Sequence, residues 1–220
     1  MSIRQNIENL KNELPETVKL VAVSKTKSVE EILEAYETGH RIFGENKAQE
    51  LISKQPELPQ DIQWHFIGHM QTNKVKYIAP FVSLIESVDS LKLLNEINKQ
   101  ANNIGRVIDC LLQFHIAEEE TKFGLDFNEA TGLLNSEEFQ AMKNVRICGV
   151  MGMATFTEDT GQVRKEFYLL KEIFNRLKNK YFIEQESFKE ISMGMSGDYK
   201  IAVEVGSTIV RIGSLIFGER

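Results

Sequence analysis

Cysteine is scarce in this chain of 220 residues, which contains only Cys110 and Cys148, each inside an apolar run. Two such residues provide neither the spacing of a metal-binding cluster nor the paired framework of a small secreted domain. We interpret both thiols as buried core residues. Their small number excludes a fold that depends on disulfide bonds or on a cysteine-bound metal.

Long apolar stretches and clusters of basic residues are also missing. No segment reaches the roughly 18 apolar residues that a membrane-spanning helix needs. The first residues predict an amphipathic helix over about 2–14, unlike the continuous apolar core of a signal peptide. The net charge is −6 and the Lys and Arg residues are scattered, so no surface for nucleic acid or an anionic membrane is predicted. We expect a cytoplasmic protein.

The composition is that of an ordinary globular protein, with 42% hydrophobic and 26% charged residues. Neither a disordered nor a fibrous chain has such values. No linker, repeat or low-complexity segment divides the sequence, so we expect one domain over residues 1–220. The composition leaves a monomer and a weak dimer equally open.

Short apolar, β-branched runs alternate with amphipathic stretches, which is typical of parallel βαβ units. The candidate strands are 18–26, 41–45, 62–68, 82–88, 107–116, 145–153, 190–195 and 209–217. Eight strands in a chain of this size favour a closed (β/α)8 TIM barrel, preceded by an extra N-terminal helix, over an open doubly wound sheet.

Two of the intervening helices have clear boundaries. Ser28 followed by Glu31 predicts a capping box, and Gly39 predicts the end of the same helix. The longest helix is expected within 160–180, where an apolar stripe recurs at helical spacing. We interpret that stripe as a packing face.

Lys25 follows an apolar strand and lies at its carboxyl end, where barrels of this class carry their active sites. Burial at the barrel mouth would lower the pKa of its amine and make it a nucleophile toward an aldehyde. On this segment alone, a solvated loop lysine is the more ordinary interpretation.

Two glycine-containing segments, 191–198 and 210–214, fall at the seventh and eighth strand ends. Barrels frequently bind phosphate with the loops that follow these two strands. Ser196 and Ser214 supply hydroxyls, and Gly213 permits close approach of the backbone. Their joint position predicts a phosphate site.

A reactive lysine and a phosphate site together suggest a phosphorylated aldehyde or ketone. Pyridoxal 5'-phosphate (PLP) as a cofactor and a sugar-phosphate aldolase both fit. Arg211 favours PLP, because its predicted inward orientation suits a contact with a pyridine nitrogen. A structural pair between Arg211 and a carboxylate is the alternative.

Five motifs occur in one order along the chain: V-A-V-S-K-T-K at 21–27, F-G-E-N at 43–46, W-H-F-I-G-H-M-Q at 64–71, S-M-G-M-S-G-D at 192–198 and V-R-I-G-S at 210–214. Together they resemble the YggS/PROSC family of PLP homeostasis proteins. The resemblance runs from the first helix to the last residue. It implies a barrel similar to the N-terminal domain of alanine racemase.

The resemblance also implies residue roles. Lys25 would carry PLP as a Schiff base, and Asn46 would lie beside the ring. Ser196, Gly213 and Ser214 would hold the phosphate, and Arg211 would face the pyridine nitrogen. Members of the family are regarded as carriers or regulators of PLP without an established reaction.

Some positions receive no role. Met70 replaces a common leucine, a volume-conserving change. Lys122 lies in a variable polar segment. His65 and His69 stand near Trp64 and Phe66, where a hydrogen-bonded core histidine is the ordinary interpretation. We leave all four residues out of the site.

The alternative function is a PLP-dependent amino acid racemase. Such enzymes take a second proton-transfer base from a β domain that follows the barrel, whereas this sequence stops just after the eighth predicted strand. We therefore expect a carrier rather than an enzyme. Delivery of PLP to apo PLP-dependent enzymes is a third possibility that the sequence leaves open.

Overall fold

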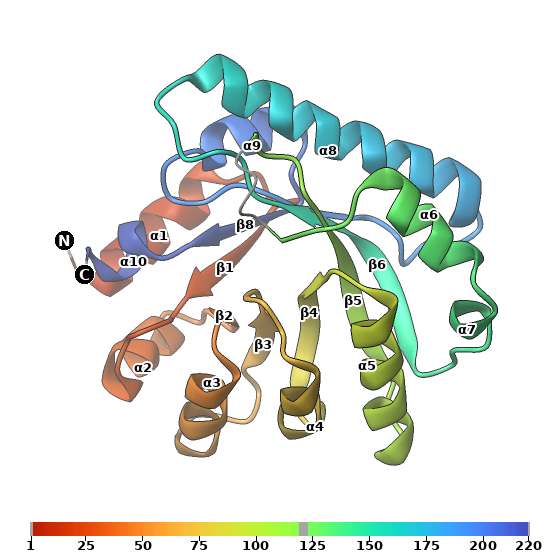
Figure 1. Cartoon of the computed structure of the whole chain (residues 1–220). Coiled ribbons are helices and arrows are strands. Elements are labelled where there is room, and N and C mark those ends of the chain that lie inside the picture. The colour runs from red at the N-terminus through yellow and green to blue at the C-terminus, as the bar shows by residue number, and fades with distance from the viewer. Residues whose placement is uncertain (1, 119–122, 220) are drawn as a thin grey trace.

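The computed structural model describes residues 2–118 and 123–219, and its eight strands form one closed parallel barrel (Figure 1). Each strand pairs with the next in chain order, and β1 pairs with β8 to close the sheet. The strands are β1 Lys19–Val23, β2 Ile42–Glu45, β3 Gln63–Phe66, β4 Val82–Val88, β5 Ile108–Phe114, β6 Val145–Gly152, β7 Glu190–Ser192 and β8 Ile209–Ile212. The predicted (β/α)8 barrel is confirmed.

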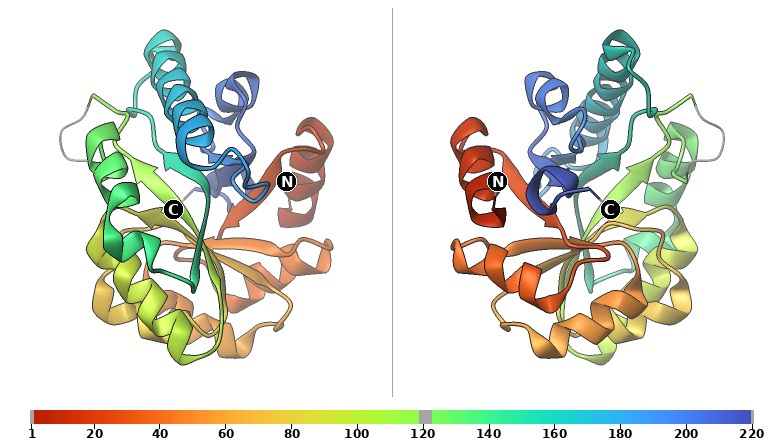
Figure 2. Two further views of the ribbon diagram at one scale, coloured as in Figure 1. Left: turned by 90° about the vertical axis from the view of Figure 1, so that its right-hand side faces the viewer. Right: turned by 90° about the vertical axis from the view of Figure 1, so that its left-hand side faces the viewer.

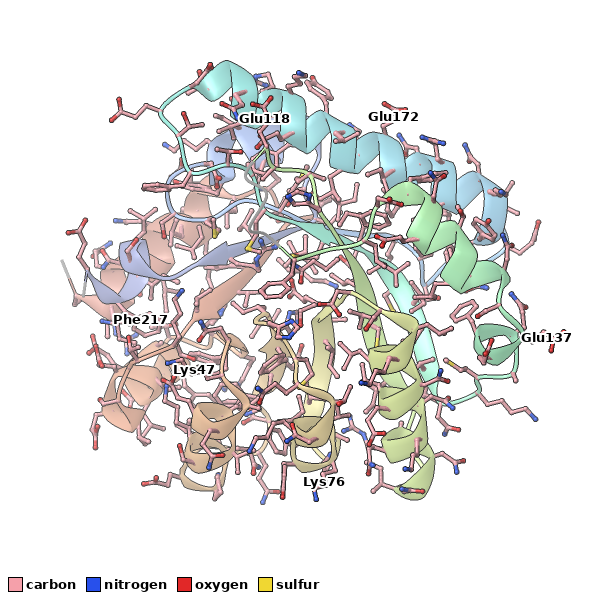
Figure 3. All side chains as sticks on the ribbon, viewed as in Figure 1. Lys47, Lys76, Glu118, Glu137, Glu172 and Phe217 are labelled. Atoms are coloured by element: carbon pink, nitrogen blue, oxygen red, sulfur yellow. The ribbon has the colours of Figure 1, made fainter. Side chains whose placement is uncertain are left out.

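Helices surround the barrel, and charged side chains such as Lys76, Glu137 and Glu172 lie on their outer faces (Figure 3). The α-helices are α1 Ile3–Glu13, α2 Val29–Glu37, α3 Ala48–Lys54, α4 Val75–Ile78, α5 Leu91–Asn103, α6 Phe127–Asn135, α7 Glu137–Gln140, α8 Thr160–Tyr181, α9 Tyr199–Val205 and α10 Ser214–Phe217. Two short 3-10 helices, Gln55–Glu57 and Thr72–Lys74, complete the described elements.

The predicted helix boundaries agree with the structure. Helix α1 is capped by Ser2, and α2 begins with the full capping box of Ser28 and Glu31. Gly39 follows α2 with φ +79°, a conformation that glycine adopts at little cost. Helix α8 buries its apolar stripe against the sheet, as expected for a packing face.

Three predicted strands extend three or more residues beyond the carboxyl ends of the observed strands. The segment 209–217 is a strand only to Ile212, because Ser214–Phe217 forms α10, whose amides donate back to Gly213 and Ser214. A short apolar run in a sequence can form either one turn of helix or a short strand, and its pattern does not separate the two. The segments 18–26 and 190–195 likewise leave the sheet early and continue as turns.

The core has two parts. A large cluster fills the space between the strands and the helices, and a smaller one lies inside the barrel. The inner cluster contains Val21, Leu84, Leu111, Cys148, Met151 and Ile209. Both cysteines are buried and free, as predicted.

Above the inner apolar cluster the barrel interior becomes polar. Glu86 lies two residues beyond Leu84 on β4, and Arg211 lies two residues beyond Ile209 on β8, so each pair shares the inward face. Ser192 and His65 are also buried there. The inner apolar cluster thus separates the polar side chains at the amino end, such as Lys19 and Glu190, from the buried charges of Glu86 and Arg211.

The first and last helices meet on the outside of the barrel, where α1 lies beside α10 (Figure 2). Asn6 Nδ2 donates to Ile216 O at 2.9 Å. None of the helices within residues 2–118 and 123–219 is both long and apolar enough to cross a membrane. Lys122, to which no role was assigned, lies outside the described residues.

Candidate functional site

One cavity of about 770 Å³ opens at the carboxyl ends of the strands. It is lined by every residue predicted for the site, namely Lys25, Asn46, Ser196, Arg211, Gly213 and Ser214. These side chains come from the ends of β1, β2, β7 and β8. Residues separated by almost the whole chain therefore share one site.

Lys25 lies in a tight turn directly after β1. The N–H of Lys27 donates to Ser24 O at 3.0 Å, and Thr26 has φ 65°. A β-branched residue rarely adopts a positive φ, because its side chain then crowds the backbone. The turn therefore holds local strain that surrounding contacts must balance.

A buried group of charged residues provides those contacts. Lys54 Nζ on α3 donates to Ser24 O at 2.9 Å, to Glu45 Oε1 at 2.8 Å and to Glu50 Oε1 at 2.6 Å. Glu50 Oε1 in turn accepts the N–H of Thr26. The backbone on both sides of Lys25 is thus anchored to α3.

Glu45 has an unusual environment within this group. Its side chain is fully buried, Ser24 Oγ donates to Oε1 at 2.7 Å, and Oε2 has no hydrogen-bond partner. Burial raises the pKa of Glu45, and the hydrogen bond from Lys54 opposes that change. Glu45 belongs to the F-G-E-N motif at 43–46, whereas neither Glu50 nor Lys54 was assigned a role from the sequence.

Asn46 follows β2 at the cavity wall. The end of β3 approaches it closely, since a Cβ on Gly68 would lie 2.1 Å from the backbone oxygen of Asn46. Only glycine fits at position 68. The close contact sets the position of Asn46 beside the turn of Lys25.

The predicted phosphate residues lie in the β7–α9 and β8–α10 loops. Gly194 has φ 95°, and a Cβ there would lie 2.6 Å from the Cβ of Ala202 on α9. This packing directs the chain toward Ser196, which is half-buried at the cavity. Ser214 faces the same cavity from the first residue of α10.

Arg211 is 4% exposed and points into the barrel interior, as predicted. Its Nη1 donates to Ser192 Oγ at 2.6 Å, and its Nη2 donates to Gly152 O at 3.1 Å. Glu86 Oε2 lies 3.9 Å from Nη1. The carboxylate that was considered as an alternative partner is therefore present, and Arg211 also lines the cavity.

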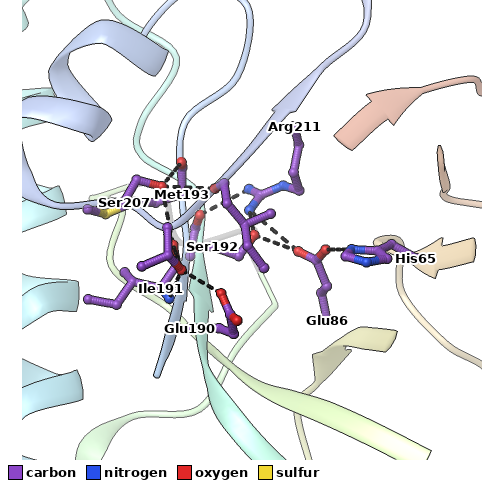
Figure 4. A network of polar contacts seen from close by, with 11 residues as sticks. His65, Glu86, Glu190, Ile191, Ser192, Met193, Ser207 and Arg211 are labelled. Atoms are coloured by element: carbon purple, nitrogen blue, oxygen red, sulfur yellow. Dashed lines mark hydrogen bonds and ion pairs between the residues drawn. The ribbon is translucent and has the colours of Figure 1, made fainter. Parts of the chain in front are cut away.

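Figure 4 shows this group of buried polar side chains. His65 Nδ1 lies 2.6 Å from Glu86 Oε1, and Ser192 Oγ donates to Glu86 Oε2 at 2.5 Å. Neither Glu86 nor Ser192 was assigned a role from the sequence, although Ser192 begins the motif at 192–198. A lone charge inside the apolar run VSLIESV was the available signal for Glu86. His65 is a hydrogen-bonded core histidine, as interpreted from the sequence.

His69 was left out of the predicted site but lines the cavity. Its ring stacks on Phe123 with 4.3 Å between centroids, and Nδ1 lies 3.3 Å from Asp89 Oδ2. Gln113 Nε2 donates to Phe123 O at 2.9 Å, which connects this wall to β5. Lys27 also faces the cavity and pairs with Glu31 at 3.4 Å.

The described part of the chain holds no group of three or more His, Cys, Asp or Glu side chains suited to a metal ion. The predicted residues on the cavity wall offer other chemistry, namely the amine of Lys25, the guanidinium of Arg211, the amide of Asn46 and the hydroxyls of Ser196 and Ser214. These groups suit a small ligand with a carbonyl and an anionic group.

Comparison with known proteins identifies the family of this chain. The family model of the alanine racemase N-terminal domain matches residues 1–220. A pyridoxal phosphate homeostasis protein of Aquifex aeolicus is 40% identical over 203 residues, which cover 92% of this chain and 87% of that protein. The human pyridoxal phosphate homeostasis protein is 39% identical over 92% of this chain and 76% of its own length.

Solved structures give the same result. PipY of Synechococcus elongatus, with PLP bound, superposes with a TM-score of 0.90 and 33% identity, over 99% of this chain and 100% of that one. Alanine racemase of E. faecalis shares the fold, with a TM-score of 0.74 and 17% identity over 58% of its chain. This chain therefore belongs to the pyridoxal phosphate homeostasis protein family, within the alanine racemase N-terminal domain fold.

Proposed function

We propose that this chain binds PLP in the cavity at the carboxyl ends of its strands and takes part in PLP homeostasis. The observation that carries the proposal is the presence of Lys25, Ser196 and Ser214 on the walls of one cavity. A lysine amine and a phosphate site in one pocket suit a phosphorylated aldehyde. The PLP-bound PipY structure, to which the chain is similar, favours PLP over a sugar phosphate.

The residues present fit this cofactor. When bound, PLP supplies an aldehyde that reacts with amines. Lys25 would attack that carbonyl with its amine, and its anchored turn holds the amine at the cavity. Ser196, Ser214 and the backbone at Gly213 would hold the phosphate. Asn46 would lie beside the ring, and Arg211 would donate to the ring nitrogen.

Attachment to Lys25 can be tested directly. Purified protein is incubated with PLP, reduced with borohydride and digested, and the modified peptide is sequenced by mass spectrometry. We expect the pyridoxyl group on Lys25 alone. Modification of Lys27, which lines the same cavity, or of Lys122 in place of Lys25 would contradict the assignment.

We further propose that the chain carries PLP without turning over amino acids, as one domain over residues 1–220. An arginine always keeps its protons, so donation from Arg211 would leave the ring nitrogen unprotonated. A carbanion next to the ring then gains little stabilisation. The relatives are named homeostasis proteins, which is consistent with a carrier.

The racemase alternative has a clear test. Protein loaded with PLP is incubated in deuterated water with L- and D-alanine, serine and lysine, and exchange of the α-proton and chirality are followed. We expect neither to change at a useful rate. Turnover near about 1 per second, at the low end of ordinary enzymes, would favour a racemase.

We also propose a cytoplasmic location and transfer of PLP to apo PLP-dependent enzymes, with the chain acting as a monomer or weak dimer. Exposed apolar side chains at the cavity support contact with a protein acceptor, because Phe156 is 96% exposed and Phe123, Met195 and Leu215 lie exposed on the same walls. Activation of an apo-enzyme by loaded protein, in the presence of a phosphatase that destroys free PLP, tests direct transfer. Activation no faster than that by free PLP would contradict it.

A further inference from the structure

Glu86 is a fully buried acid inside the barrel, and the proposed roles do not use it. A buried charge without partners is very costly, so its contacts must stabilise it. Burial raises the pKa of Glu86, but the hydrogen bonds from His65 and Ser192 and the charge of Arg211 together bring it below its usual value. Glu86 is therefore a carboxylate at neutral pH.

The direction of each hydrogen bond follows from the chemistry of the groups. A guanidinium can only donate and a carboxylate can only accept. Ser192 Oγ therefore accepts from Arg211 Nη1 at 2.6 Å and gives its own proton to Glu86 Oε2 at 2.5 Å. His65 must carry its proton on Nδ1 to donate to Glu86 Oε1 at 2.6 Å. The hydroxyl of Ser192 thus joins the two charges in one orientation.

This arrangement fixes the guanidinium of Arg211 from two sides. Nη1 is tied to Ser192 on β7, and Nη2 is tied to Gly152 O at the end of β6. An unrestrained arginine loses considerable rotamer entropy when it must hold one geometry. Both contacts are made to groups of the protein itself, so the protein supplies part of the ordering that a bound ligand would otherwise require.

We propose that Glu86 is a positioning residue for Arg211. Through Ser192 it sets the plane of the guanidinium and balances its charge, so that the remaining N–H donors of Arg211 serve the ligand in the cavity. His65 holds the second oxygen of Glu86 and completes the chain of contacts. This inference rests on the proposed donation from Arg211 to the ring nitrogen of PLP.

The test compares two ligands, PLP and deazapyridoxal 5'-phosphate, in which a C–H replaces the ring nitrogen. Wild-type protein should bind PLP about tenfold more tightly, as expected when a donor loses its acceptor. Glu86→Gln keeps the shape of the side chain and removes its charge. We expect this variant to lose most of the preference for PLP while its affinity for the deaza analogue changes little.

Glu190→Gln is the matched control. Glu190 is another buried glutamate on a barrel strand, but its partners are Lys19 and Thr208 rather than Arg211. This variant should keep the wild-type preference between the two ligands. The 15N chemical shift of labelled PLP, which responds to hydrogen bonding at the ring nitrogen, should move in Glu86→Gln and stay unchanged in Glu190→Gln.

The outcomes separate the two proposals. Equal affinity of wild-type protein for both ligands would contradict the contact between Arg211 and the ring nitrogen, and with it the role of Glu86. A preference that survives in Glu86→Gln, or an equal loss of affinity for both ligands, would overturn the positioning role alone. If Glu86→Gln does not fold, Ser192→Ala removes the bridge. Ser207→Ala is the control, because Ser207 is also a buried serine but its hydroxyl contacts the backbone oxygens of Met193 and Ile209, and the same outcomes decide.

Discussion

Both ends of the barrel carry polar side chains, but those at the amino end pair with one another, whereas those at the carboxyl end line a cavity. At the amino end, Lys19 pairs with Glu190 at 2.6 Å, Thr208 donates to the same carboxylate at 2.8 Å, and Arg146 holds Asp109 through two hydrogen bonds. At the carboxyl end, comparable groups line a cavity of about 770 Å³. Polar residues at strand ends therefore do not identify a site by themselves.

The backbone differs between the ends as well. The turn after β1 contains a threonine with positive φ, held by Glu50 and Lys54, whereas the closest polar contacts at the amino end require no such conformation. Strain that is balanced by neighbours is characteristic of functional segments. We expect substitutions at the carboxyl end to change ligand binding, and substitutions at the amino end to change stability.

The largest effect is expected for Lys25→Ala. The variant should lose covalent attachment of PLP completely, because no amine remains at that position of the turn. Its unfolding temperature without ligand should stay within a few degrees of wild type, since Lys25 contributes little to the core. Borohydride reduction with mass spectrometry measures attachment, and circular dichroism measures unfolding.

Lys27→Ala provides the control for that variant, because Lys27 lines the same cavity, where its amine donates to Phe217 O at 3.1 Å. It should keep attachment at Lys25. Loss of attachment in Lys27→Ala but not in Lys25→Ala would reverse the assignment of the two lysines.

At the amino end, His40 should control stability as a function of pH. Its Nε2 donates to Ile42 O at 2.7 Å, and burial lowers the pKa of His40 from 6.5 to about 4. The unfolded chain takes up this proton near pH 6.5 and the folded chain only near pH 4, so stability falls as the pH falls between these values. The loss due to His40 should reach about 3 kcal/mol.

The comparison with His40→Gln isolates this effect from that of the carboxylates. Glutamine can keep a donor toward Ile42 O but does not titrate. Between pH 7 and pH 4, the free energy of unfolding of wild-type protein should therefore fall by about 3 kcal/mol more than that of His40→Gln, as measured by urea unfolding. A constant difference over that range would contradict the prediction.

Ser196→Ala and Ser214→Ala should each weaken retention of PLP. A hydrogen bond to a charged acceptor contributes about 1.5 to 3 kcal/mol, or roughly ten- to hundredfold in affinity. Affinity for pyridoxal, which lacks the phosphate, should change much less. Equal losses for both ligands, measured by titration, would argue against contact with the phosphate.

Thr208→Val tests whether loss of a hydroxyl at the amino end of the barrel also changes ligand affinity. Thr208 lies at the amino end of β8, where its hydroxyl donates to Glu190. This variant should leave the affinities for PLP and pyridoxal unchanged. A loss of PLP affinity as large as that in Ser214→Ala would remove the distinction between the two ends.

The smallest effect is expected for Lys19→Met. The Lys19 side chain is half exposed, and such ion pairs typically contribute less than about 1 kcal/mol. We expect a stability loss of that size at low salt, and a smaller one in concentrated salt, with no change in PLP affinity. Urea unfolding at two salt concentrations measures both.

The sequence predicted the part of the structure that has local signals. Strands appear as short apolar runs, and their number and order were sufficient to predict a closed barrel with Ser196 and Ser214 in adjacent loops. The predicted end of the eighth strand was wrong. The segment Ser214–Phe217 is apolar enough for a strand, but it forms α10, which packs against α1. Such a contact has no local signal.

The supporting residues of the site were harder to predict for the same reason. Lys54 looks like a solvated helix residue until the fold brings it to Glu45 and Ser24. Ser192 and Glu86 are 106 residues apart in the chain, so no helical or strand periodicity relates the two positions. Long-range polar contacts of this kind become visible only once the strands are arranged in three dimensions.

The closure of the sheet between β1 and β8 has a consequence for biosynthesis. Lys25 leaves the ribosome long before Arg211, Gly213 and Ser214, because almost the whole barrel lies between them in the chain. During translation the growing sheet has two unpaired edges, a state prone to association with other chains. The cavity is complete only after β8 docks on β1, so we expect a nascent chain to acquire the proposed ligand site only when the barrel closes.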